Sequence, residues 1–99
     1  MDSLILSRRD LDFLLFEWLE VDRLTERDRF ADHSRDTFEA VLDLAETIAT
    51  NEFAPHNKLN DSSEPTFDGT TVTVNPEVKK AVDAFSHAGF IGSTMDESV

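Results

Sequence analysis

The sequence predicts a mainly α fold, a small helical domain of about three helices with a short β-hairpin before the last helix. Two patterns support this prediction. Apolar residues recur every three or four positions in three separate stretches, which is the spacing of one helix face. An Asp-Gly pair precedes a short alternating run of threonine and valine, which is typical of a hairpin. The 99 residues suffice for one small domain.

The first helix is expected from Arg8 to about Leu24, and with its connector it occupies residues 1–33. Ser7 can act as its N-cap, with Asp10 in the first turn. One apolar stripe contains Leu11, Leu14, Leu15, Trp18 and Leu19, and Phe13 and Phe16 lie outside it. The helix is therefore apolar around most of its circumference. Either the other helices cover it on both sides, or one of its faces docks on protein.

The longest helix is expected in residues 34–55. Ser34 can cap its first turn, and Pro55 should end it by Ala54, because proline disfavours the helical conformation of the residue before it. The apolar stripe contains Phe38, Val41, Leu42, Ala45, Ile48, Ala49 and Phe53. The opposite polar face contains Glu39, Asp43, Glu46 and Thr50. This amphipathic pattern predicts that the remaining elements pack against this helix.

In the second half of the chain the sequence predicts smaller elements. Residues 56–75 should contain a loop followed by a hairpin, whose turn is at Asp68-Gly69 and whose strands pack against helices. Residues 76–90 should form the last helix, with Asn75 as N-cap and Pro76 in the first turn. Gly89 should end this helix and let Phe90 fold back on Phe85. Residues 91–99 show no periodic pattern and are interpreted as a truncated tail.

The charge and composition disfavour several classes of partner. The formal net charge is −12, from 21 acidic and 9 basic residues, so the basic surface needed for nucleic acid or anionic membranes is missing. No stretch approaches the length of a membrane span, and no signal peptide is indicated. Cysteine is absent, which excludes disulfides and thiolate chemistry. We expect a soluble cytoplasmic protein whose acidic surface keeps it in solution.

No catalytic, cofactor-binding or metal-binding residue can be assigned. His33, His56 and His87 lack the close spacing of a metal site. The three glycines suit turns and caps rather than a phosphate-binding loop. Glu17, between Phe16 and Trp18, is the one acid whose pKa could be altered by an apolar setting. Its expected place is the polar edge of the first helix.

The order of residues resembles that of the acyl-CoA dehydrogenases, in particular the N-terminal helical region of their large bacterial subfamily. The resemblance covers nearly the whole chain and depends on distributed apolar and turn residues rather than on a catalytic signature. It involves residues 9–17 (RDLDFLLFE), Asp36-Thr37, Val41-Leu42, Ala45, residues 53–55 (FAP), 67–69 (FDG), 71–74 (TVTV), 76–81 (PEVKKA) and 88–90 (AGF).

The resemblance implies a parent enzyme that binds FAD and oxidises acyl-CoA to 2,3-enoyl-CoA. In this family the flavin and thioester contacts come from later domains, so no functional residue of the family has a counterpart here. The chain would be an N-terminal portion with a packing role. It would contact the remaining domains and form a homo-oligomer through Leu11, Phe13, Leu14, Leu15, Phe16, Trp18 and Leu19. The alternative is a stand-alone acidic helical module that binds a protein partner through the same surface.

Overall fold

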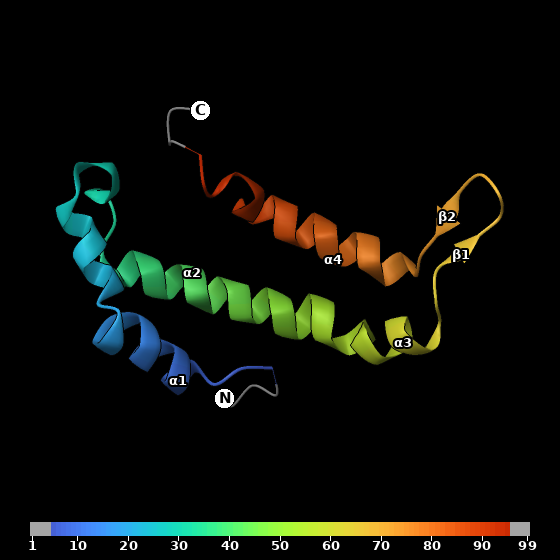
Figure 1. The fold of residues 1–99 in the computed structure, drawn as a ribbon, viewed down its shortest axis with the longest axis horizontal. Helices are drawn as coiled ribbons and strands as arrows, with labels where there is room; N and C mark the ends of the chain where they lie inside the picture. Colours follow the sequence, from blue (N-terminus) through green and yellow to red (C-terminus); the bar gives the residue numbers. More distant parts are fainter. Residues whose placement is uncertain (1–4, 96–99) are drawn as a thin grey trace. The chain divides into compact units, whose positions relative to one another are not determined.

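The computed structural model describes residues 5–95, and the chain divides into two units, Met1–Glu46 and Thr47–Val99 (Figure 1). Helices dominate both units, and one antiparallel hairpin precedes the last helix. The predicted mainly α fold is therefore confirmed. None of the helices within residues 5–95 combines the length and apolar character needed to cross a bilayer.

The first unit begins with a helical segment that is shorter than expected. Helix α1 (Arg8–Asp12) continues into a π-helix, η1 (Phe13–Trp18), and a left-handed Glu20 with φ of 51° follows. Two 3₁₀ helices, η2 (Val21–Glu26) and η3 (Asp28–Phe30), then form the connector. The prediction of one helix from Arg8 to Leu24 was wrong, because a residue in the left-handed conformation cannot continue a right-handed helix.

Helix α2 (Arg35–Ile48) starts where the sequence predicts it. The Ser34 hydroxyl accepts a hydrogen bond from the Thr37 N–H at 3.3 Å, which confirms the N-cap. The α-helical pattern then changes to a π-helix, η4 (Ala49–Phe53), and to a 3₁₀ turn, η5 (Ala54–His56). The chain thus changes from one helix type to another before Pro55, and it does not stop being helical there.

Residues after Pro55 form a helix, α3 (Asn57–Ser62), where a loop was expected. Proline lies in the first turn of η5, where its missing N–H is tolerated because first-turn donors have no partner inside the helix. The prediction that the chain becomes irregular after Pro55 was therefore wrong. Within residues 5–95, α3 is thus a helix that the sequence did not predict.

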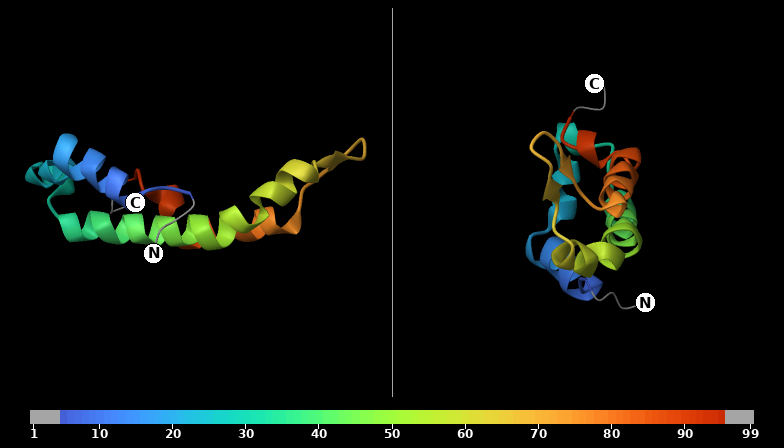
Figure 2. Two further views of the ribbon diagram at one scale, coloured as in Figure 1. Left: turned by 90° about the horizontal axis from the view of Figure 1, so that it is seen from below. Right: turned by 90° about the vertical axis from the view of Figure 1, so that its right-hand side faces the viewer.

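The hairpin pairs β1 (Thr66–Phe67) with β2 (Val72–Thr73), and Phe67 lies opposite Val72. The turn is longer than the predicted two-residue turn and contains residues 68–71, with Gly69 at φ of 100°. The hairpin extends away from α3 and from the last helix, α4 (Pro76–His87) (Figure 2). Both strands are exposed, so the expected packing of the ribbon on helices was wrong.

The Asp68 carboxylate organises this turn. It accepts hydrogen bonds from the N–H groups of Thr71, at 2.7 Å, and Thr70, at 2.8 Å. Hydrogen bonds to the ionised form, that from Thr71 first, lower the pKa of Asp68 below its ordinary value of 3.8. The turn is therefore held by the charged form of one side chain.

We expect the hairpin to lose stability in acid. A carboxyl group whose pKa is lowered by folding stabilises the fold above its unfolded pKa, and this contribution disappears as the pH falls through the folded pKa. The loss should therefore occur below pH 3.8. NMR titration of the Asp68 carboxyl and of the Thr71 amide can measure it, with Asp68→Asn as the control that shows no such step. A midpoint above 3.8 would contradict the assignment.

Helix α4 starts at Pro76 as predicted and ends at His87, shortly before Gly89, the residue that was expected to end it. Gly89 has φ of 87°, and its N–H donates to the Ser86 carbonyl at 3.0 Å. The Phe85 and Phe90 rings stack with centroids 5.1 Å apart, as predicted for this type of helix end. At the other end, Asn75 is the N-cap residue, but its side chain makes no cap hydrogen bond.

Few apolar side chains are buried among the described residues. They are Phe16, Ile48 and Ala81. The expected stripes are thus only partly covered, and Val41, Phe53 and Val82 are exposed. Phe16 was placed outside the main stripe of the first helix, yet it is the apolar residue that the described part of the first unit buries. The covered positions 8, 11, 12, 15 and 16 still follow a 3.6-residue period, so the predicted stripe was placed on the wrong side of the helix rather than given the wrong spacing.

Candidate functional site

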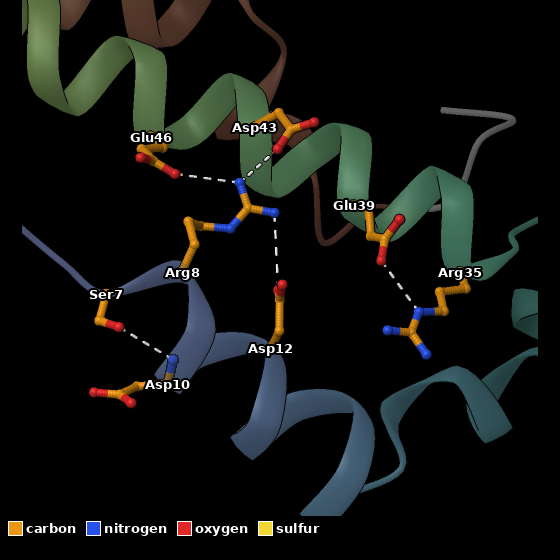
Figure 3. A network of polar contacts seen from close by, with 8 residues as sticks. All are labelled: Ser7, Arg8, Asp10, Asp12, Arg35, Glu39, Asp43 and Glu46. Carbon is orange, nitrogen blue, oxygen red and sulfur yellow. Dashed lines mark hydrogen bonds and ion pairs between the residues drawn. The ribbon is translucent and has the colours of Figure 1, made fainter. Parts of the chain in front are cut away.

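The α1–η1 segment has a defined inner side. Phe16 is only 6% exposed, and the Arg35 guanidinium lies over its ring, 4.4 Å from the centroid. Arg35 also donates from Nε to a Glu39 carboxylate oxygen at 3.1 Å (Figure 3). This places a cation on an aromatic face while its charge is balanced by a carboxylate on the same helix. The inner side of η1 is therefore fixed against the start of α2.

Arg8 anchors the beginning of the segment to α2. Its Nη1 donates to Asp43 at 2.5 Å and to Glu46 at 3.2 Å, and Nη2 lies 3.8 Å from Asp12 (Figure 3). The hydrogen bond to Asp43 raises the pKa of Arg8 above its ordinary value. The Ser7 hydroxyl accepts from the Asp10 N–H at 3.2 Å, which confirms the predicted cap. Both ends of the inner side are thus held by polar contacts.

The opposite side of the segment is apolar and exposed. Phe13 and Trp18 are 53% and 69% exposed, and Leu14 and Leu19 are exposed as well. We call these four residues, Phe13, Leu14, Trp18 and Leu19, the outer face. Leu11 and Leu15 are half-buried, and Phe16 is buried. Of the seven apolar residues that the sequence proposes as a contact surface, four are therefore exposed, two are half-buried, and Phe16 is buried, which corrects its place in that surface.

Charged residues border the outer face. A groove of about 570 Å³ beside it is lined by Arg9, Asp10, Asp12, Phe13, Glu17 and Arg35. Glu17 is exposed, so it lies on the polar edge of the helix rather than in an apolar pocket. A large apolar surface bordered by charges is typical of a surface that docks on protein.

His33, His56 and His87 each contact different residues. His33 stacks on Phe38 with centroids 5.9 Å apart. His87 is exposed in a groove of about 430 Å³ with Glu52, Lys79, Lys80 and Asp83, and Lys79 pairs with Asp83 at 2.6 Å. Within residues 5–95, no group of three or more His, Asp or Glu side chains is placed to bind a metal ion.

His56 is buried in a chain of hydrogen bonds that the sequence did not indicate. Its Nε2 lies 2.6 Å from the Glu52 carbonyl and its Nδ1 lies 2.7 Å from the Asn60 amide nitrogen. Asn75 donates to the Asn60 side-chain oxygen at 2.9 Å and to the Ser63 carbonyl at 3.4 Å. This chain ties the start of α4 to α3. His56 and Asn60 are four positions apart, so the sequence would indicate their contact only if residues 57–62 were expected to form a helix.

Comparisons with known proteins add no identification. No protein-family model, no curated protein and no solved structure matches this chain.

Proposed function

We propose that this chain is the N-terminal helical part of an FAD-dependent acyl-CoA dehydrogenase of the cytoplasm. The full-length enzyme would oxidise acyl-CoA to 2,3-enoyl-CoA with FAD as its cofactor, and this part would serve for packing and have no active site. The order of residues 9–17 and of the later segments named above supports the choice of family. The outer face supports the packing role.

The outer face supports this proposal because contact between its apolar side chains and water is unfavourable. Phe13 and Trp18 expose more than half of their surface, and burial of a large apolar side chain contributes about 1.5–3 kcal/mol. Burial of this face by protein would therefore be favourable by several such contributions. The inner side of the same segment is already fixed by Arg8 and Phe16, so docking needs no rearrangement of the helix.

A second function is favoured by the same face together with the charge. A stand-alone acidic module with net charge −12 could use the outer face to bind a protein partner. The two functions differ in what lies downstream of Val99 in the gene.

The deciding experiment determines the reading frame beyond the Val99 codon and characterises its product. The dehydrogenase proposal expects several hundred further residues, a purified protein with flavin absorbance, and acyl-CoA oxidation with an artificial electron acceptor. A stop codon directly after Val99, or a long product that binds no flavin, would reject it. In the first case the interaction module becomes the better proposal.

We expect the 99-residue chain alone to bind neither FAD nor acyl-CoA. Phosphate groups need clustered basic side chains or a glycine-rich helix start, whereas the nine basic residues of this chain are dispersed among 21 acidic ones. Fluorescence titration of FAD, and quenching of Trp18 by acyl-CoA, can measure this. Saturable binding at micromolar ligand would contradict the prediction. The full-length product serves as the positive control.

A further inference from the structure

The side chain of Asn75 closes the base of the hairpin. β1 starts three residues after Ser63, and β2 ends two residues before Asn75. The Asn75 amide bonds to the Ser63 carbonyl and to the Asn60 side chain, so it links the exit of the hairpin to its entry and to α3 (Figure 1). Because the strand residues are exposed, packing contributes little, and this link holds the base of the hairpin against α3.

The same link is one end of the hydrogen-bond chain through His56. Both ends of that chain are backbone carbonyls, which can only accept. The Glu52 carbonyl accepts from Nε2 of His56, and the Ser63 carbonyl accepts from Asn75. Between them, Nδ1 of His56 accepts from Asn60, whose oxygen accepts from Asn75. Every donor therefore meets an acceptor only while the imidazole ring is neutral.

A proton on Nδ1 would give the chain one donor too many. The protonated ring donates from both nitrogens, so the Asn60 amide must turn its oxygen toward His56. The Asn60 nitrogen then faces Asn75, which must turn its own oxygen inward, where it meets the Ser63 carbonyl, a second acceptor. His56 is only 8% exposed, so water has little access to relieve the conflict. The surplus donor is thus passed along the chain and breaks its last link.

We propose that His56 is a pH-dependent lock on the base of the hairpin. While the ring is neutral, Asn75 holds Ser63 and the base is closed. When the ring is protonated, Asn75 releases Ser63, and the hairpin moves independently of α3. Histidine changes its charge between about pH 5 and pH 8, whereas the acid step at Asp68 lies below pH 3.8, so the two effects are separate. The lock needs no flavin and no further domain and is independent of the proposed function.

The charges around His56 are balanced. The ionisable side chains on the neighbouring elements are Glu52 on η4, Lys58 and Asp61 on α3, and, on the side of α4 that lines a groove with Glu52, Lys79, Lys80, Asp83 and His87. Glu52 is half-buried, Asp83 is paired with Lys79, and solvent screens the exposed others. Glu52 is therefore the neighbouring charge with the largest expected influence on the ring.

NMR titration of the isotope-labelled 99-residue chain from about pH 8 to about pH 5 tests the lock. The side-chain amide signals of Asn60 and Asn75 should shift with the same midpoint as the His56 ring. The carbonyl carbon of Ser63 should move upfield over the same range, because its hydrogen bond is lost. Backbone order parameters of residues 66–73 should fall from about 0.85 to below about 0.6 as the hairpin becomes mobile.

His56→Gln is the matched variant. Glutamine takes up no proton, and its amide can donate to the Glu52 carbonyl and accept from Asn60, as the neutral ring does. This variant should stay closed down to about pH 5, whereas His33→Gln, His87→Gln and Glu52→Gln should open as the original chain does. Asn75→Ala should leave the hairpin mobile at every pH, and it removes no cap hydrogen bond from α4. Circular dichroism checks that every variant is folded.

Several outcomes would overturn the lock. The first is that His56 stays neutral down to about pH 5, or that it titrates while Asn75 and Ser63 do not respond. The second is that His56→Gln opens in acid like the original chain. If His56→Gln does not fold, Asn75→Ala decides. A hairpin that is as rigid in Asn75→Ala as in the original chain at about pH 8 would show that the link does not hold it.

Discussion

Replacement of Phe16 by alanine is expected to lower the free energy of unfolding by about 3–5 kcal/mol. Phe16 is 6% exposed and is the apolar side chain that the described part of the first unit buries. Its removal leaves a cavity, and Arg35 loses the ring over which its guanidinium lies. A small domain has a total stability of about 5–15 kcal/mol, so the loss is a large share. Chemical denaturation followed by circular dichroism measures it.

The matched control is Phe13→Ala, three positions earlier in the same helical segment. Phe13 is 53% exposed, so its truncation leaves no comparable cavity, and a change of less than about 1 kcal/mol is expected. Equal losses for the two variants would mean that the inner and outer sides of the segment are assigned wrongly. Such a result would also remove the outer face as a docking surface.

Ile48→Ala is expected to lower the free energy of unfolding by about 2–5 kcal/mol. Ile48 is 9% exposed at the point where α2 passes into the π-helix η4. Removal of its side chain beyond Cβ leaves a cavity at the junction of two helix types. Thermal and denaturant unfolding of the variant can be compared with those of the original chain.

Leu44→Ala provides the control, because leucine and isoleucine have the same number of carbon atoms and both residues lie in α2. Leu44 is 43% exposed, so less apolar surface returns to water and less of a cavity forms. We expect its loss to be less than half of that for Ile48→Ala. Indistinguishable midpoints for the two variants would show that Ile48 is not a core residue.

Local signals in the sequence predict the ends of the elements well. Ser7, Ser34 and Gly89 act through hydrogen bonds and dihedral angles that involve only neighbouring residues, and all three end or begin helices as expected. Pro55 was misleading because its effect depends on the position within a helix. In the first turn of η5 the missing N–H costs nothing, so the chain continues into α3.

The candidate site was predictable in part. The excess of apolar residues in Leu11 to Leu19 agrees with a helix that is covered on one side only. Because apolar residues occur on most sides, their spacing does not identify the inner side, and the structure buries Phe16 instead of the predicted stripe. Glu46 illustrates the same limit for polar residues. The sequence places it on a free polar face, whereas the structure pairs it with Arg8, which is distant in sequence. Periodicity alone contains no information on such long-range partners.

The hydrogen-bond chain through His56 has a fixed direction. The Glu52 carbonyl can only accept, so Nε2 of the ring must carry a hydrogen and Nδ1 must accept from Asn60. The Asn60 oxygen is then turned toward Asn75, whose amide group donates. Each side chain thus sets the orientation of the next. An aspartate at position 60 would match asparagine in size, but it would replace the donating amide nitrogen with an oxygen that can only accept. A change of donor or acceptor at position 56, 60 or 75 therefore requires matching changes at the other two.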